Sequence, residues 1–254
     1  MYGTIMNNEA YLRRRGLPIV NSADKNSPTG LFSKDIFGVT DDEKETRAAL
    51  INLYCYVMRP LFVAIFRTVQ RSIALCATAN TRDGDYFIRK GIVAPCDDKY
   101  IPEPGDIVGG GPSFLYNNWD KIDTKAWQQE FGKYANKEMK SSISKFTRDQ
   151  MFKHHQYVIP IAYRAEDDDS RMLVNDVNVL LSDIIRYSNV LASIGNKQSM
   201  GADIKTRDIE CLVQRACNEY YNFMKGRHLG PKGTGRKQIL SRAVDNSSLI
   251  VMLP

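Results

Sequence analysis

Two long stretches with the periodicity of amphipathic helices, separated by a short polar break, occupy the second half of this sequence. Apolar residues recur in both at steps of 1, 3 and 4, and Asn175 or Asp176 can cap the first stretch. The break, residues 195–201, consists of turn formers. We therefore expect an antiparallel helical hairpin with facing apolar stripes. The stripes are Val177, Leu180, Leu181, Ile184, Tyr187, Leu191 and Ile194, and Ile209, Leu212, Val213, Ala216, Tyr220, Phe223 and Met224.

The polar residues of the hairpin are predicted to lie on its outer faces. They include Asp183, Arg186, Lys205, Arg207, Glu210 and Arg215. Such a hairpin can protrude as a docking arm, and a helical pair packed into its own domain fits the same pattern equally well. Four of these residues are our candidates for binding a partner protein: Asp183, Arg186, Arg207 and Glu210.

Positive charge is concentrated just after the hairpin. The net charge is +6, and residues 222–244 contain no Asp or Glu. The stretch also contains glycines, so its backbone can lie close to a polyanion while its side chains reach phosphates. A flexible, solvated basic segment is the alternative interpretation. Its six cationic residues are Lys225, Arg227, Lys232, Arg236, Lys237 and Arg242.

The first part of the chain predicts short elements of mixed type. Residues 30–38 form a compact apolar island that suits one helical turn, and residues 50–75 read as two buried segments joined at Pro60. Glycines and prolines divide residues 80–118 into short strands and turns, and 121–150 is compatible with a helix. Residues 157–163 read as an edge strand, because a central proline cannot donate to a ladder. With 43% hydrophobic and 25% charged residues, the chain is expected to be a globular α+β protein.

Residues that would form an independent catalytic or metal site are scarce. His154 and His155 are adjacent and poorly placed to share a metal, and His228 lies in the basic stretch. The acidic run 166–169 is typical of a solvated turn, and the glycines at 109–111 lack the lysine of a phosphate-binding loop. Five cysteines without a Cys-x-x-Cys pair favour reduced thiols. We expect a soluble, cytoplasmic protein, because the sequence contains neither a membrane-spanning stretch nor the layout of a signal peptide.

Five segments, taken in order, resemble the N-terminal part of the largest (β′) subunit of multisubunit DNA-directed RNA polymerases. The segment 30–38 is similar to Gly-Leu-Phe-Cys-x-x-Ile-Phe-Gly, and 50–62 to Gly-His-Ile-Glu-Leu followed by His-Pro-x-Phe. The segment 157–164 resembles Val-Leu-Pro-Val-Pro-Pro, and 174–191 resembles the start of the clamp coiled coil. The segment 235–251 resembles the switch that follows it. Residues 76–150 match nothing in the family.

The resemblance implies a role for the helical hairpin and a role for the basic stretch that follows it. The helical hairpin would be the clamp arm that holds the promoter-specificity factor, and the basic stretch would be the switch that contacts template phosphates. Arg236, Lys237 and Arg242 are carried over as template contacts, and Lys232 lies in the same basic stretch. The sequence stops before the family's Asn-Ala-Asp-Phe-Asp-Gly-Asp loop, whose aspartates hold the catalytic Mg²⁺. No catalytic residue is therefore expected on this chain, and Mg²⁺ is expected on a partner.

Three departures from the family refine this expectation. An acidic linker replaces the four-cysteine zinc ribbon between Gly38 and Leu50, so no zinc is expected. Ala243 replaces a basic residue of the switch. The loop between hairpin and switch is short, so the family's rudder, the element that this loop would have to form, is not expected in full. Split, zinc-free largest subunits are characteristic of giant tailed bacteriophages, and this chain resembles one of their β′ N-terminal pieces.

The predicted organisation follows from these matches. Residues 1–75 would form an N-terminal clamp segment, 76–165 a strand-and-turn region with a helical insertion, 166–224 the clamp hairpin and 225–254 the switch. The expected partners are a C-terminal β′-like subunit, β-like subunits, a sigma-like subunit, template DNA and the RNA–DNA hybrid. No membrane is expected, and the location would be the cytoplasm of an infected bacterial host, a virion or a phage compartment. Two other classes remain open: a non-enzymatic nucleic-acid binding or packaging protein, and a scaffold whose hairpin only oligomerises.

Overall fold

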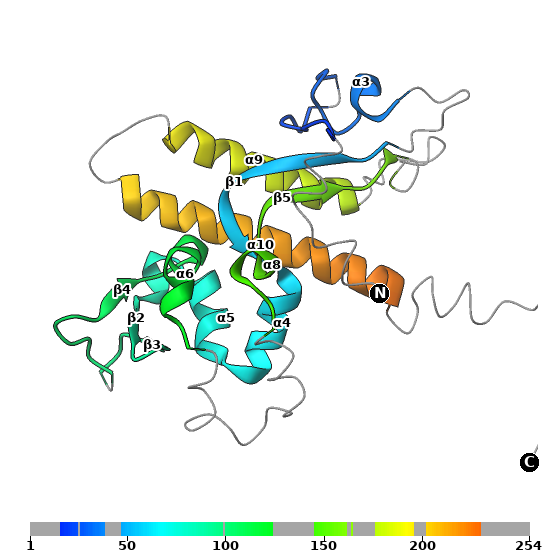
Figure 1. Ribbon diagram of the computed structural model, residues 1–254. Helices are drawn as coiled ribbons and strands as arrows, with labels where there is room; N and C mark the ends of the chain where they lie inside the picture. The colour runs from blue at the N-terminus through cyan, green and yellow to red at the C-terminus, as the bar shows by residue number, and fades with distance from the viewer. Residues whose placement is uncertain are drawn as a thin grey trace, which may run out of the picture.

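The computed structural model of the chain describes residues 16–24, 26–38, 47–98, 100–123, 145–161, 164, 176–195 and 202–229. In this part of the chain helices and short antiparallel strands are mixed, which confirms the α+β class (Figure 1). None of its helices has both the length and the apolar character needed to cross a membrane.

A long helical hairpin lies behind a two-stranded ribbon (Figure 1). The helices are α9 (Asp176–Gly195) and α10 (Ala202–Leu229), which confirms both predicted helices. The ribbon pairs β1 (Ala49–Met58) with β5 (Phe152–Val158) in antiparallel register. Alternate β1 side chains, those of Leu53, Cys55 and Val57, face a first hydrophobic core that also contains the apolar stripes of the two helices.

The strand predicted over residues 157–163 is displaced toward the N-terminus. β5 ends at Val158, two residues before Pro160, because a proline cannot donate to the ladder. Its residues Lys153 and Gln156 are polar in the sequence but are buried in the structure and hydrogen-bonded to each other. Buried polar residues that hydrogen-bond to each other interrupt the alternation of apolar residues by which a strand is recognised in a sequence.

A second lobe is inserted between β1 and β5, and a second hydrophobic core fills it. Pro60 occupies the first turn of α4, where its missing N–H costs nothing. The short strands confirm the predicted strands and turns over residues 86–109, and they form one antiparallel sheet in the order β3–β2–β4. The same prediction is wrong for residues 112–118, which form a helix that begins at Pro112, a residue suited to a first helical turn. The elements of the lobe are α4 (Pro60–Val69), α5 (Arg71–Thr78), η1 (Thr81–Asp83), β2 (Tyr86–Arg89), β3 (Ile92–Pro95), β4 (Ile107–Gly109), α6 (Pro112–Asn118), η2 (Trp119–Lys121) and α8 (Arg148–Met151).

The short helix α3 (Lys34–Phe37) forms from the apolar island predicted for residues 30–38, and it buries Ile36 and Phe37 in the first core. The second core combines α4 and α5 with residues 86–122, so it spans the predicted boundary between residues 75 and 76. Most of the helix-compatible stretch 121–150 and the acidic linker 39–46 lie outside the described residues.

Both ends of the second lobe are anchored where the ribbon ends. Met58 pairs with Phe152, and the N–H of Arg59 donates to the carbonyl of Met151 at 2.8 Å. Gln214 of α10 is fully buried and completes the edge of β1 at this point. Its amide accepts a hydrogen bond from the Met58 N–H at 2.7 Å and donates to the Met58 carbonyl at 2.8 Å, as a neighbouring strand would.

Candidate functional site

The predicted DNA-binding residues Lys232, Arg236, Lys237 and Arg242 lie outside the described residues. The structure describes only the beginning of the basic stretch. Helix α10 continues to Leu229, and Lys225 and Arg227 are exposed on its last turns. Basic side chains at the C-terminal end of a helix interact favourably with its dipole.

Of the predicted partner-binding residues of α9, Arg186 is exposed, as expected for an outer face, and Asp183 is half-buried. Arg186 is 69% exposed and lies 3.5 Å from the Asp183 carboxylate, one turn earlier on the same helix. Val179 and Val190 extend the same exposed face on either side. The sequence analysis missed these two valines, although their spacing of 4, 3 and 4 with Asp183 and Arg186 indicates one helical face.

The prediction that Arg207 and Glu210 lie on an outer face of the hairpin is wrong. The N-terminal half of α10 packs against the second lobe, and the side chain of Arg207 is only 14% exposed. Its guanidinium donates to the carbonyl oxygens of Ala79 at 3.3 Å, Asn80 at 3.2 Å and Gly84 at 2.6 Å, and it pairs with the Asp85 carboxylate. Arg207 therefore holds together two parts of the same chain.

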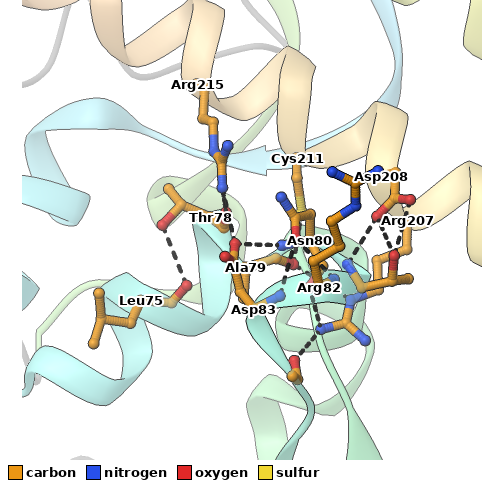
Figure 2. Close-up of polar contacts among 12 residues, drawn as sticks. Leu75, Thr78, Ala79, Asn80, Arg82, Asp83, Arg207, Asp208, Cys211 and Arg215 are labelled. Atoms are coloured by element: carbon orange, nitrogen blue, oxygen red, sulfur yellow. Dashed lines mark hydrogen bonds and ion pairs between the residues drawn. The ribbon is translucent and has the colours of Figure 1, made fainter.

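Figure 2 shows that three further side chains of α10 reach the same backbone segment. Asp208 accepts hydrogen bonds from the Thr81 N–H and hydroxyl, both at 2.8 Å, and these bonds lower the pKa of its carboxyl group. Arg215 donates to the Thr78 carbonyl and to Asp83, both at 2.9 Å. The Cys211 thiol donates to the Ala79 carbonyl at 2.9 Å. We call this set of contacts between α10 and residues 78–85 the α10 junction.

Glu210 faces α6 from the same half of α10. Its carboxylate accepts a hydrogen bond from the Ser113 hydroxyl at 2.7 Å, yet burial raises the pKa of this carboxyl group. The glycine run that precedes α6 accommodates the neighbouring arginine, because a Cβ on Gly110 would collide with the Arg207 guanidinium. The absence of a side chain at Gly110, in the glycine run that lacks the lysine of a phosphate-binding loop, therefore has a packing reason.

Arg164 is a second buried arginine, and it joins three segments that are far apart in the sequence. Its guanidinium donates to the Ile159 carbonyl at 2.9 Å, to Asn178 Oδ1 at 2.9 Å and to the Leu31 carbonyl. The Asn178 amide donates back to the Arg164 carbonyl at 3.0 Å. The guanidinium also lies 4.7 Å from the centre of the Phe37 ring, an arrangement typical of a cation–π contact.

The residues considered as metal ligands are only partly described. The ring centroids of His154 and His155 lie 5.1 Å apart, on β5. Within the described part of the chain, no three histidine, cysteine or acidic side chains are grouped so that they could hold a metal ion. The acidic run 166–169 lies outside this part. The five cysteines are free thiols, and burial raises the pKa of Cys211 to about 12, which keeps this thiol protonated at neutral pH.

No protein-family model matches this sequence, and no curated protein matches it either.

Proposed function

We propose that this chain is the β′-like N-terminal subunit of a multisubunit DNA-directed RNA polymerase of the giant-phage type. The observation that carries the proposal is the convergence on Arg164. The segments 30–38, 157–164 and 174–191 resemble the polymerase family in sequence order, and Arg164 hydrogen-bonds to a residue of each of the first and last. Segments selected by resemblance alone have no reason to meet around one buried side chain.

The two hydrophobic cores add to this argument. The first core contains residues of four resembling segments, including Leu31, Ile51, Val158 and Val177. Of the unmatched residues 76–150, those that the structure describes contribute to the second core and not to the first. This division favours a shared structural unit that carries an additional lobe particular to this chain.

The proposed roles follow the order of the elements. The exposed face of α9 around Arg186 would dock the promoter-specificity subunit, and the basic stretch that begins at the end of α10 would contact template phosphates through Lys232, Arg236, Lys237 and Arg242. Nucleotidyl transfer would be two-metal chemistry on a C-terminal β′-like partner, which supplies the aspartates for Mg²⁺. This chain would position the DNA and the factor in the infected bacterial cytoplasm.

The first experiment is affinity purification of the tagged full chain from infected or co-expressing cells, with mass spectrometry of the proteins retained after a salt wash. We expect a chain with an Asp-x-Asp-x-Asp loop together with β-like chains. Recovery of DNA alone would favour a binding or packaging protein. Recovery of further copies of this chain alone would favour a scaffold, and either result would overturn the polymerase assignment.

A variant of the exposed face tests the docking role. We expect Arg186→Glu to impair factor-dependent initiation while extension of a primed template is preserved, because the substitution leaves the core untouched. Equal loss of both activities would contradict a specific docking role. Arg207 is unsuitable for this test, since its substitution would disturb the α10 junction.

A triple alanine variant tests the proposed template contacts. Replacement of Arg236, Lys237 and Arg242 is expected to reduce transcription by the assembled enzyme and leave assembly intact, because phosphate contacts contribute affinity without holding subunits together. Unchanged elongation at moderate salt would contradict the assignment.

A further inference from the structure

The part of the sequence that forms β1 and the first two helices of the second lobe contains no acidic residue. Residues 46–82 include neither Asp nor Glu, and their only charged side chains are arginines. The sequence analysis did not single out this run, because its charges are far apart among apolar residues. The structure decides which of these charges are available at the surface. The arginines are Arg47, Arg59, Arg67, Arg71 and Arg82.

Two of these arginines lie where α4 meets α5, beneath α10 in Figure 1. Arg67 is in the last turn of α4, and Arg71 is the first residue of α5. Both are exposed, and among the described residues neither has an ion pair or a side-chain hydrogen bond. Arg89 of β2, in contrast, is paired with Asp106 at 2.6 Å. Positive charge is therefore available where the two helices meet.

The start of α5 adds hydrogen-bond donors beside these arginines. The N–H groups in the first turn of a helix have no acceptor within the helix. Gln70 is the N-cap residue, but its side chain makes no capping hydrogen bond, and the first turn contains no acidic residue. Ser72, half-buried in the same turn, adds a hydroxyl group. Uncapped N–H groups next to arginines are suited to bind an anion.

Gln70 supplies an independent sign that a group outside the described contacts binds here. The residue joins the two helices and is only 2% exposed. Among the described residues, neither the nitrogen nor the oxygen of its amide has a hydrogen-bond partner. A buried amide without a partner costs free energy, and a bound group that accepts its N–H would remove part of this cost. We call the set formed by Arg67, Gln70, Arg71 and Ser72 the α4–α5 corner.

We propose that the α4–α5 corner binds backbone phosphate groups of nucleic acid. The guanidinium group of arginine matches the oxygens of a phosphate, and the start of a helix donates N–H groups to the same kind of anion. Exposed arginines contribute little to binding a single free anion or a carboxylate of an acidic protein, because water screens the charges.

A polymer of phosphates gains more from the same two arginines. Its binding releases counterions, and one long molecule can contact both the α4–α5 corner and the basic stretch 222–244. These two effects favour nucleic acid over a small anion. The inference does not depend on the proposed polymerase function, because it concerns binding by the purified chain.

The test measures binding of a labelled duplex of about 20 base pairs to the purified full chain at several salt concentrations. The decisive variant combines Arg67→Ala with Arg71→Ala, which should leave thermal stability unchanged because both side chains are exposed. We expect an affinity about tenfold lower and a salt slope smaller by about 2, one for each lost phosphate contact. Lysine at both positions should bind more tightly than alanine, since the charge is kept.

The matched control combines Lys34→Ala with Lys90→Ala, which removes the same charge from exposed positions in α3 and in the turn after β2. It should leave duplex binding nearly unchanged. Inorganic phosphate, at the same concentration of phosphate groups, should not displace the duplex, and binding of polyglutamate should depend less on the two arginines.

Three results would overturn the proposal. The first is that the double alanine variant binds the duplex as tightly as the original chain or as the control. The second is that inorganic phosphate displaces the duplex, which would assign the α4–α5 corner to a small anion. The third is that polyglutamate depends on Arg67 and Arg71 as strongly as the duplex does, which would favour an acidic protein.

Discussion

Glu210 shows how the setting of one residue changes its contribution to stability. Its carboxylate has the Ser113 hydroxyl as a donor, but burial raises its pKa, so folding disfavours the charged form. For an acid with a raised folded-state pKa, the protonated form contributes stability at low pH. That contribution is lost as the pH rises through the folded-state pKa.

We therefore predict that Glu210→Gln stabilises the protein at neutral pH, by about 1 kcal/mol, because the amide keeps an acceptor for Ser113 without a buried charge. The difference from the original chain should be small at low pH and should grow as the pH rises above the ordinary pKa of a glutamate. Thermal unfolding followed by circular dichroism at several pH values measures it. The exposed Glu219→Gln on the same helix is the control, and an equal or opposite effect of the two substitutions would contradict the prediction.

At the scale of elements, the junction of β1 with α10 depends on a side chain that substitutes for a strand. The Gln214 amide pairs with both polar backbone groups of Met58 where β1 separates from β5. Both groups are buried there, and an unpaired buried backbone group costs more than a hydrogen bond gains.

Gln214→Met should therefore destabilise the protein by about 2–4 kcal/mol, because it keeps the volume and leaves two backbone groups without partners. Chemical denaturation gives the change in unfolding free energy. Glu219→Met places the same side chain at an exposed position of α10 and should change stability little. Similar losses for the two variants would show that the paired amide is unimportant.

The elements also show what the sequence can predict. The two helices were predictable because their apolar stripes repeat over several turns. The environment of Arg207 was not, because periodicity places apolar residues inward and treats every charged residue as exposed. The backbone carbonyls that receive its guanidinium belong to residues 79–84, more than 120 positions away, and carry no sequence signal. The φ of +56° at Tyr54, where the register of β1 and β5 shifts, was not predictable for the same reason, because that register depends on two strands that are far apart in the sequence.

At the scale of the whole molecule, α10 contacts both parts of the structure by different means. Its apolar side chains, among them Val213 and Tyr220, belong to the first core. Its polar side chains form the α10 junction with the second lobe. The second lobe is thus held to the hairpin by hydrogen bonds and ion pairs more than by a continuous apolar interface.

We predict that Arg207→Ala loosens the second lobe selectively. Hydrogen exchange, followed by mass spectrometry, should become faster in α5 and β2, while α9 and β1 keep their protection. The cost in stability should be about 2 kcal/mol, because a carboxylate and three carbonyl oxygens lose their donor. Arg186→Ala, at the exposed arginine of α9, is the matched control. A uniform acceleration over both cores, or no difference between the variants, would contradict the prediction.

The pairing of Met58 with Phe152 has a consequence for how such a molecule can arise. The two ends of the second lobe lie side by side on adjacent strands, so everything between them occupies the place of a hairpin turn. A segment can be inserted or deleted at such a position without a change in the pairing or register of the flanking strands, because its two ends lie next to each other. The ribbon can therefore keep its register whatever the size of the segment inserted between Met58 and Phe152.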